Sequence, residues 1–113
     1  MLKPLKKAGW LETAFLLIGY LTRYKVEGDS MTPTIEPGDD VAVDPNGTLA
    51  EGDIVVIRHP YIKDIVMIKR VFRIEEDERL FLSSDNPFES TDSRTFGAVS
   101  LECVKGKAVA ILK

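Results

Sequence analysis

Hydrophobic residues occur at helical spacing near the start of the chain. Residues 9–22 read GWLETAFLLIGYLT, and this pattern predicts an amphipathic helix over about 9–22. Its broad apolar face holds Trp10, Leu11, Ala14, Phe15, Leu17, Ile18 and Leu21. Such a helix would be about 21 Å long, shorter than the ~30 Å hydrocarbon core of a bilayer, and it contains Glu12. We therefore expect no spanning helix, and instead one that lies on a membrane surface or packs on a protein.

From residue 26 onward the pattern changes to short β-type runs separated by turns. The expected strands lie at residues 41–43, 54–57, 65–74, 80–82 and 108–112, and residues 83–97 form a polar loop. Short strands at this spacing predict a mainly β fold, a small antiparallel sheet or partial barrel. The chain thus divides into a basic N-terminal segment, residues 1–25, and a β domain, residues 26–113.

Composition narrows the function classes. The 113 residues carry a net charge of −3, which argues against a nucleic-acid partner. Cys103 and His59 are the only residues of their types, so neither a disulfide nor a usual zinc site is expected, and no cofactor is implied. The positive charge gathers in residues 1–25, which favours peripheral contact with an anionic membrane surface, although a cytoplasmic location also fits.

Lys69 is a candidate general base. It lies in the middle of a predicted strand, on the face of Ile65, Met67 and Val71. If that face points inward, burial favours the neutral amine, which can accept a proton near neutral pH. The alternative is that the opposite face, with Val66 and Ile68, is the buried one and that Lys69 is in solvent.

Ser30 is a candidate nucleophile. It lies in the turn-like segment 28–34, where Gly28 lets the backbone approach a substrate closely. Such a turn can present a hydroxyl and its own N–H to one carbonyl group, but it is also compatible with an ordinary Ser/Thr turn. A Ser-His-Asp triad would depend on His59, and the G-x-S-x-G and S-x-x-K motifs are absent.

Four segments, in chain order, resemble the boxes of the signal peptidase I family, whose members use a serine–lysine dyad. They are Gly28-Asp29-Ser30-Met31-Thr32-Pro33-Thr34-Ile35, Gly52-Asp53-Ile54-Val55-Val56, Ile68-Lys69-Arg70-Val71, and Asp85-Asn86 with Ser90-Thr91-Asp92-Ser93-Arg94 and Gly97. The resemblance implies a fold of the signal peptidase and repressor-protease type. It also implies that Ser30 attacks the scissile carbonyl and that Lys69 takes its proton.

The same resemblance implies supporting roles for further residues. Ser90 would orient the lysine, Asp92 and Arg94 would form an ion pair, Met31 would shape the substrate pocket behind the nucleophile, and Asp85 belongs to the last box. Two positions depart from the family pattern. Ser84 stands where glycine is usual, and Gly28 stands where some members have a serine that contributes to the oxyanion hole.

Two motifs indicate a subfamily and a protein substrate. Arg58-His59-Pro60 and the segment from Asp85-Asn86-Pro87 to Thr95-Phe96-Gly97 resemble the nickel-type superoxide dismutase maturation protease. That likeness implies removal of an N-terminal extension from an enzyme precursor. Other interpretations are a general signal peptidase activity like that of the mitochondrial inner-membrane peptidases, a self-cleaving repressor-type domain cut at Ala8-Gly9, and an inactive binding module.

Overall fold

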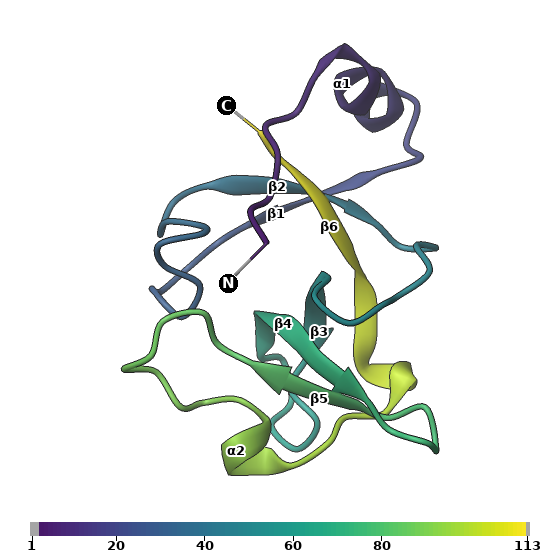
Figure 1. Cartoon of the computed structure of the whole chain (residues 1–113). Helices are drawn as coiled ribbons and strands as arrows, with labels where there is room; N and C mark the ends of the chain where they lie inside the picture. The colour runs from purple at the N-terminus through teal and green to yellow at the C-terminus, as the bar shows by residue number, and fades with distance from the viewer. Residues whose placement is uncertain (1–2, 113) are drawn as a thin grey trace.

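The protein folds around one antiparallel sheet, which the computed structural model describes over residues 3–112 (Figure 1). The strands are β1 Thr22–Lys25, β2 Asp40–Asp44, β3 Ile54–Arg58, β4 Val66–Ile74, β5 Leu80–Ser83 and β6 Val104–Leu112. The helices are α1 Trp10–Leu17, α2 Ser93–Phe96 and the short 3-10 helix η1 Leu101–Cys103. The sheet order is β1-β2-β6-β3-β4-β5. This architecture confirms the predicted mainly β fold with a short N-terminal helix.

The long strand β6 joins two halves of a bent sheet. One half contains β1 and β2, and the other contains β3, β4 and β5 (Figure 1). The pairing of β6 shifts register at Ala42/Val43 and at Val56/Ile57, and such irregularities bend a strand and increase its twist. At Gly106 a Cβ atom would collide with Val43 and with the backbone of Asp44. Glycine therefore permits the close approach of β2 and β6 at the bend.

The central strand β3 is buried on both faces, which creates two hydrophobic clusters. Ile54 and Val56 face the first cluster, and Val55 and Ile57 face the second. The first cluster also contains Val26, Met31, Ile35, Val41, Val43, Ile68, Ala108 and Ile111. The second contains Val71, Leu80, Leu82, Phe96, Val99 and Cys103. Neighbouring positions of the adjacent strand β4 therefore face two different interiors.

The N-terminal helix is shorter than its hydrophobic pattern predicts. It ends at Leu17 instead of continuing to residue 22, and Gly19 follows with φ of +80°, a left-handed conformation that terminates helices. Residues Thr22–Lys25 instead pair with β2, so part of the basic segment belongs to the sheet. Backbone pairing in the sheet outweighs the local helical pattern here. No residue of α1 is buried, so its apolar face is largely exposed.

Candidate active site

Lys69 is buried in the middle of β4. It pairs in register with Val55, so its side chain shares the face of the second hydrophobic cluster. The residue is only 3% exposed. Ile68, on the opposite face, is also buried, so the two faces are not alternatives: both are covered at this point of the strand. Of the two orientations left open by the sequence, the one in which the face of Lys69 points inward is therefore the one observed.

Burial lowers the pKa of Lys69, because removing an ammonium from water disfavours the charged form. Glu89 and Asp92 oppose this effect electrostatically and Arg94 adds to it, but burial is the largest influence. Among residues 3–112, no carboxylate forms an ion pair with Lys69. Its environment is therefore that of a lysine poised to lose its proton.

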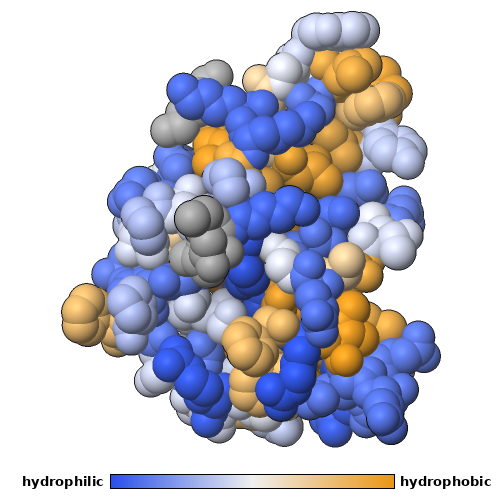
Figure 2. All heavy atoms as spheres, viewed as in Figure 1, coloured by the Kyte–Doolittle hydropathy of each residue, from blue (hydrophilic) through white to orange (hydrophobic). Residues whose placement is uncertain are grey.

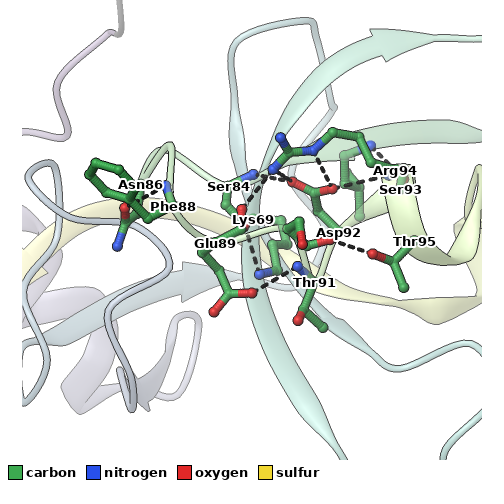
Figure 3. Close-up of polar contacts among 12 residues, drawn as sticks. Lys69, Ser84, Asn86, Phe88, Glu89, Thr91, Asp92, Ser93, Arg94 and Thr95 are labelled. Atoms are coloured by element: carbon green, nitrogen blue, oxygen red, sulfur yellow. Dashed lines mark hydrogen bonds and ion pairs between the residues drawn. The ribbon is translucent and has the colours of Figure 1, made fainter.

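The Lys69 amine donates a hydrogen bond to Ser84. Nζ lies 3.1 Å from Oγ of Ser84, the residue that directly follows β5 (Figure 3). The backbone N–H of Ser84 donates to Oδ2 of Asp92 at 2.9 Å. The sequence predicted no role for Ser84. It did show that a serine stands at a position where the resembling family has glycine. This departure places a hydroxyl beside the candidate base.

Asp92 and Arg94 form the ion pair that the family resemblance implies. Arg94 donates to the Asp92 carboxylate through Nε at 3.0 Å and Nη2 at 2.9 Å. Asp92 is fully buried and caps the N-terminus of α2 by accepting from the backbone N–H of Arg94. Burial raises the pKa of Asp92, but the hydrogen bonds from Arg94 and Ser84 outweigh it and leave that pKa below its ordinary value.

Ser90 is not placed where the family resemblance puts it. Its side chain is exposed, and within residues 3–112 its hydroxyl forms no hydrogen bond with Lys69. Its carbonyl oxygen accepts from Asp92 N at 2.8 Å and from the Thr95 hydroxyl. The backbone of Ser90 thus supports the loop, and the implied contact with the lysine is made by Ser84 instead. The resemblance to the family boxes could not show which serine contacts Lys69, because both serines lie in the same loop.

Ser30 lies in a turn whose backbone groups are partly free. Gly28 adopts φ of +76°, which favours glycine, and Ser30 follows two residues later. Asn86 fastens the turn: its N–H donates to Ser30 O at 2.9 Å and its Nδ2 donates to Asp29 O at 3.0 Å. In the described part of the chain, neither the N–H nor the Oγ of Ser30 has a hydrogen-bond partner. Both groups are therefore available to a bound carbonyl.

A buried ion pair connects β4 with the segment that contains Ser30. Arg70 donates to Asp85 through Nε at 2.9 Å and Nη2 at 2.7 Å, and its Nη1 donates to Gly52 O at 2.7 Å. The Thr34 hydroxyl donates to the same Asp85 carboxylate. Asp85 was a predicted site residue, whereas Arg70 and Thr34 were not assigned a role. The network anchors the turn to the strand that carries Lys69.

Met31 has a different position from the one expected. It was predicted to shape a substrate pocket behind Ser30, but it is fully buried in the first hydrophobic cluster. A side chain with no exposed surface anchors the turn to the core and does not line an open pocket. The apolar residue directly after the serine therefore serves to hold the turn in place.

The segment Ser84–Asn86 contacts both halves of the candidate site. Ser84 accepts from Lys69, Asp85 pairs with the residue next to Lys69, and Asn86 holds the carbonyl of Ser30. Within residues 3–112, no hydrogen bond joins Ser30 directly to Lys69. In the same range, no group of three or more His, Cys, Asp or Glu side chains is arranged to hold a metal ion. The arrangement combines a free hydroxyl, a free N–H and a buried amine.

Three proteins similar in sequence to this chain are all named as mitochondrial inner membrane protease subunits. A mitochondrial ATP-independent inner membrane protease subunit 1a from Arabidopsis thaliana is 29% identical over 110 residues, covering 74% of this chain and 66% of that protein. A mitochondrial inner membrane protease subunit 2 from Danio rerio is 31% identical over 120 residues, covering 84% of this chain and 64% of that protein. The subunit 2 from Schizosaccharomyces pombe is 27% identical over 111 residues, covering 77% and 62%.

The chain spans less than two thirds of the length of each of these three relatives. A family model described as Peptidase S24-like matches residues 14–108, which include every predicted site residue and all of the strands from β1 to β5. The chain therefore belongs to the Peptidase S24-like family.

Proposed function

We propose that the protein is a serine endopeptidase in which Ser30 is the nucleophile and Lys69 is the general base. The neutral Lys69 amine takes the Ser30 proton as Oγ bonds to the scissile carbonyl carbon. The Ser30 N–H donates to the developing oxyanion. The protonated Lys69 then gives its proton to the leaving amine, and water hydrolyses the acyl-enzyme with Lys69 again as base.

One observation carries this proposal: among residues 3–112, no carboxylate pairs with the buried amine of Lys69. A buried cation is normally paired, because leaving it unpaired is costly. A lysine buried beside a hydroxyl has its pKa lowered by that burial, and a serine–lysine mechanism requires a base of this kind. The protease names of the three relatives support the same reaction class.

An open strand edge beside Lys69 supports a peptide substrate. On one side, β4 pairs with β3 from Val66 to Arg70. On the other side, β5 pairs only from Arg70 onward, so within residues 3–112 the edge of residues 66–69 has no strand partner. An extended peptide can add to such an edge through main-chain hydrogen bonds, and this would lead its scissile bond toward Lys69.

We further propose that the substrate is a precursor with an N-terminal extension, in the first instance a nickel superoxide dismutase precursor. The two motifs that resemble the maturation protease pack together. The ring of His59, from the first motif, lies 5.2 Å from the ring of Phe96, from the second. His59 also accepts hydrogen bonds through Nδ1 from the N–H groups of Tyr61 and Ile62. The alternative within the same activity is general removal of signal peptides.

The exposed apolar side of α1 supports peripheral association with a membrane surface. Trp10 is 79% exposed and Leu17 is 83% exposed, and Figure 2 shows apolar side chains gathered over this helix. Lysines 3, 6 and 7 precede the helix and suit anionic headgroups. Among residues 3–112, none of the helices has the length and apolar character needed to cross a bilayer.

Peptide cleavage, read by mass spectrometry, tests the proposed reaction. The wild-type chain should cut a nickel superoxide dismutase precursor, a signal-peptide substrate, or both, and the choice identifies the substrate class. Ser30→Ala should abolish cleavage, and Ser90→Ala, which alters an exposed hydroxyl of the same region, is the matched control. If the wild type cuts neither substrate, or Ser30→Ala cuts as fast, the protein is not this peptidase.

The same experiment separates the self-cleaving alternative. Ala8 and Gly9 lie beside α1, at the end of the molecule opposite to α2 (Figure 1). The Ala8 N–H also donates to Ile111 O, which ties Ala8 to β6. We therefore expect the mass of the enzyme to stay unchanged during incubation. A size change that Lys69→Ala prevents would favour a repressor-type domain instead.

Flotation with liposomes tests the membrane contact. The triple variant Trp10→Ser, Leu17→Ser and Ile18→Ser should lose binding to vesicles that contain anionic lipid, because these side chains supply the exposed apolar surface. Leu101→Ser, at an exposed apolar position in η1, is the control. Equal flotation of the triple variant and the wild type would exclude α1 as the contact.

A further inference from the structure

We infer that Ser84, and not Ser90, is the hydroxyl that positions the Lys69 amine. This inference rests on the proposed serine–lysine mechanism and assigns it a positioning residue. Ser84 departs from the glycine that is usual at this place in the resembling family. The change from glycine to serine supplies the hydroxyl oxygen that lies 3.1 Å from Lys69 Nζ.

The Ser84 hydroxyl is held in place from both directions along the chain. Ser83, directly before it, pairs in register with Arg70 of β4, next to Lys69. The backbone N–H of Ser84 itself donates to the buried carboxylate of Asp92. The Asp92 carboxylate is fixed in turn by two hydrogen bonds from the Arg94 guanidinium. The result is a continuous path of hydrogen bonds from Arg94 through Asp92 and Ser84 to Lys69 (Figure 3).

A second attachment fixes the same loop to the sheet. Ser93, at the start of α2, accepts through Oγ from the backbone N–H of Leu82 at 2.8 Å, and Ser93 is buried. This bond holds α2 against β5 on the side where Ser84 emerges. The position of Ser84 Oγ is therefore set by buried backbone and ionic contacts, which is what a positioning group needs.

A hydroxyl suits this role better than a carboxylate would. By accepting one N–H of Lys69, Ser84 directs the amine without placing a negative charge against it. A carboxylate at this distance would stabilise the ammonium and so oppose the loss of its proton. The charged groups that act on Lys69 are Glu89, Asp92 and Arg94, and Arg94 pairs with Asp92. Ser84, by contrast, contacts the Lys69 amine through an uncharged hydroxyl.

Ser90 lacks the features that make Ser84 a positioning group. Its side chain is exposed, and in the described residues its hydroxyl has no hydrogen-bond partner. Its contribution to the loop comes through the carbonyl oxygen, which any residue supplies. Replacing the Ser90 side chain therefore removes a hydroxyl from the same loop without disturbing the contacts of Lys69. This makes Ser90→Ala the matched control for Ser84→Ala.

The test compares the kinetics of the full chain and its Ser84→Ala, Ser84→Thr and Ser90→Ala variants. Ser84→Ala keeps the backbone bond to Asp92, so the fold is retained and only the contact with Lys69 is lost. We expect kcat to fall about 10- to 100-fold with KM little changed, because a misplaced base loses about this much. Ser84→Thr restores the hydroxyl and should recover most of kcat. Ser90→Ala should stay within about twofold of wild type.

A pH profile and NMR of the lysine provide readouts that a merely structural role would not move. Loss of the Ser84 acceptor removes stabilisation of the ammonium, so the pH at which kcat/KM rises should shift downward in Ser84→Ala. The Lys69 side-chain signal should titrate at the same lower pH. If Ser84→Ala matches the wild type in kcat and in the titration of Lys69, or if Ser90→Ala causes the larger change, the inference is overturned.

The two proposals fail in different ways. If Ser30→Ala and Lys69→Ala abolish cleavage while Ser84→Ala does not, the peptidase stands and the assignment of Ser84 is wrong. If the wild type cleaves no substrate, the proposed function is wrong. The NMR titration then still decides whether Ser84 contacts the Lys69 amine, because it does not depend on turnover. Should Ser84→Ala fail to fold, Ser84→Gly, which puts the residue usual in the resembling family at this position, removes the same hydroxyl and carries the same decision.

Discussion

Lys69 and Arg70 are adjacent cations on opposite faces of β4, and their surroundings differ. Arg70, 5% exposed, faces the side of the first hydrophobic cluster and is paired with Asp85 and the carbonyl of Gly52. Lys69, 3% exposed, faces the second cluster, and within residues 3–112 the one hydrogen bond of its amine goes to the hydroxyl of Ser84. The two cations are therefore about equally buried, but Arg70 has a carboxylate partner and, within residues 3–112, Lys69 has none.

This difference separates a structural cation from a reactive one. A guanidinium keeps its proton in any protein environment, so burying it requires a counter-charge, which Asp85 supplies. An amine can avoid the cost of burial by releasing its proton, which leaves a lone pair for chemistry. The face with the ion pair holds the nucleophile turn in place, and the face without one supplies the base.

The largest expected effect concerns Lys69→Met. An apolar side chain of similar length fills the same space but cannot accept a proton, so kcat/KM should fall at least about 1,000-fold. Stability should not fall at neutral pH, because a buried polar amine is replaced by an apolar group. Cleavage assays and urea unfolding measure the two effects separately. A Lys69→Met variant that unfolds easily would mean that Lys69 also has a structural role.

The opposite result is expected for Arg70→Met. This change leaves the Asp85 carboxylate buried without its counter-charge, so the free energy of unfolding should fall by about 3–5 kcal/mol. Any loss of activity should follow from displacement of the Ser30 turn, because Thr34 also depends on Asp85. Urea unfolding monitored by circular dichroism measures the change.

The double variant Arg70→Met with Asp85→Leu is the control for this result. It removes both charges, so most of the lost stability should return, since an apolar pair of similar volume often replaces a buried ion pair at little cost. If the double variant is as unstable as Arg70→Met alone, the uncompensated charge is not the cause. The comparison between the two faces would then need a different explanation.

The strands were predictable because their signal is local. The run Ile54 to Ile57 and the long strand around Lys69 reappear as β3 and β4 within one residue of their expected bounds. The strand β1 was missed, because Thr22 falls at the end of the predicted helix and residues 22–25 become a strand only by pairing with β2. Local periodicity cannot report a partner that lies about twenty residues further along the chain.

The site was predictable at the level of residue types but not of contacts. The resemblance to the family boxes implied an ion pair between Asp92 and Arg94, and this pair is present. The hydroxyl beside Lys69 could not be chosen, because Ser84 and Ser90 lie six positions apart in one loop and only the folded backbone decides which of them reaches the lysine. Met31 shows the same limit, since the sequence does not tell whether an apolar residue faces a pocket or the core.

The pH dependence of stability gives a smaller and sharper test of the Lys69 face. The pKa of Lys69 is lowered in the folded protein and is ordinary, ~10.4, in the unfolded chain. Between these two values the unfolded chain binds more protons than the folded protein, so stability rises with pH. The wild type should therefore gain stability relative to Lys69→Met as the pH increases toward ~10.4. The pKa of Glu89, which Lys69 helps to lower, lies below its ordinary value and thus outside this range. Parallel stability curves would therefore contradict a lowered pKa of Lys69.

The smallest expected effect concerns Glu89, the carboxylate with the largest electrostatic influence on Lys69. Its negative charge raises the pKa of Lys69 against the effect of burial, and its Oε1 accepts from the N–H of Thr91. Glu89→Gln keeps a side-chain oxygen that can accept that hydrogen bond but removes the charge. The pH at which kcat/KM rises should therefore move downward, with little change in the maximum rate.

The pH profile of Glu89→Gln separates charge from position at the Lys69 amine. Glu76→Gln, in the acidic turn after β4, removes an equal charge at an exposed site away from the lysine and should leave the profile unchanged. A downward shift in Glu89→Gln alone means that the lysine senses a local charge, as a buried and unpaired amine must. If both variants shift the profile equally, net charge is responsible. If neither does, the Lys69 amine is shielded from Glu89, and its pKa is set by burial and the Ser84 contact.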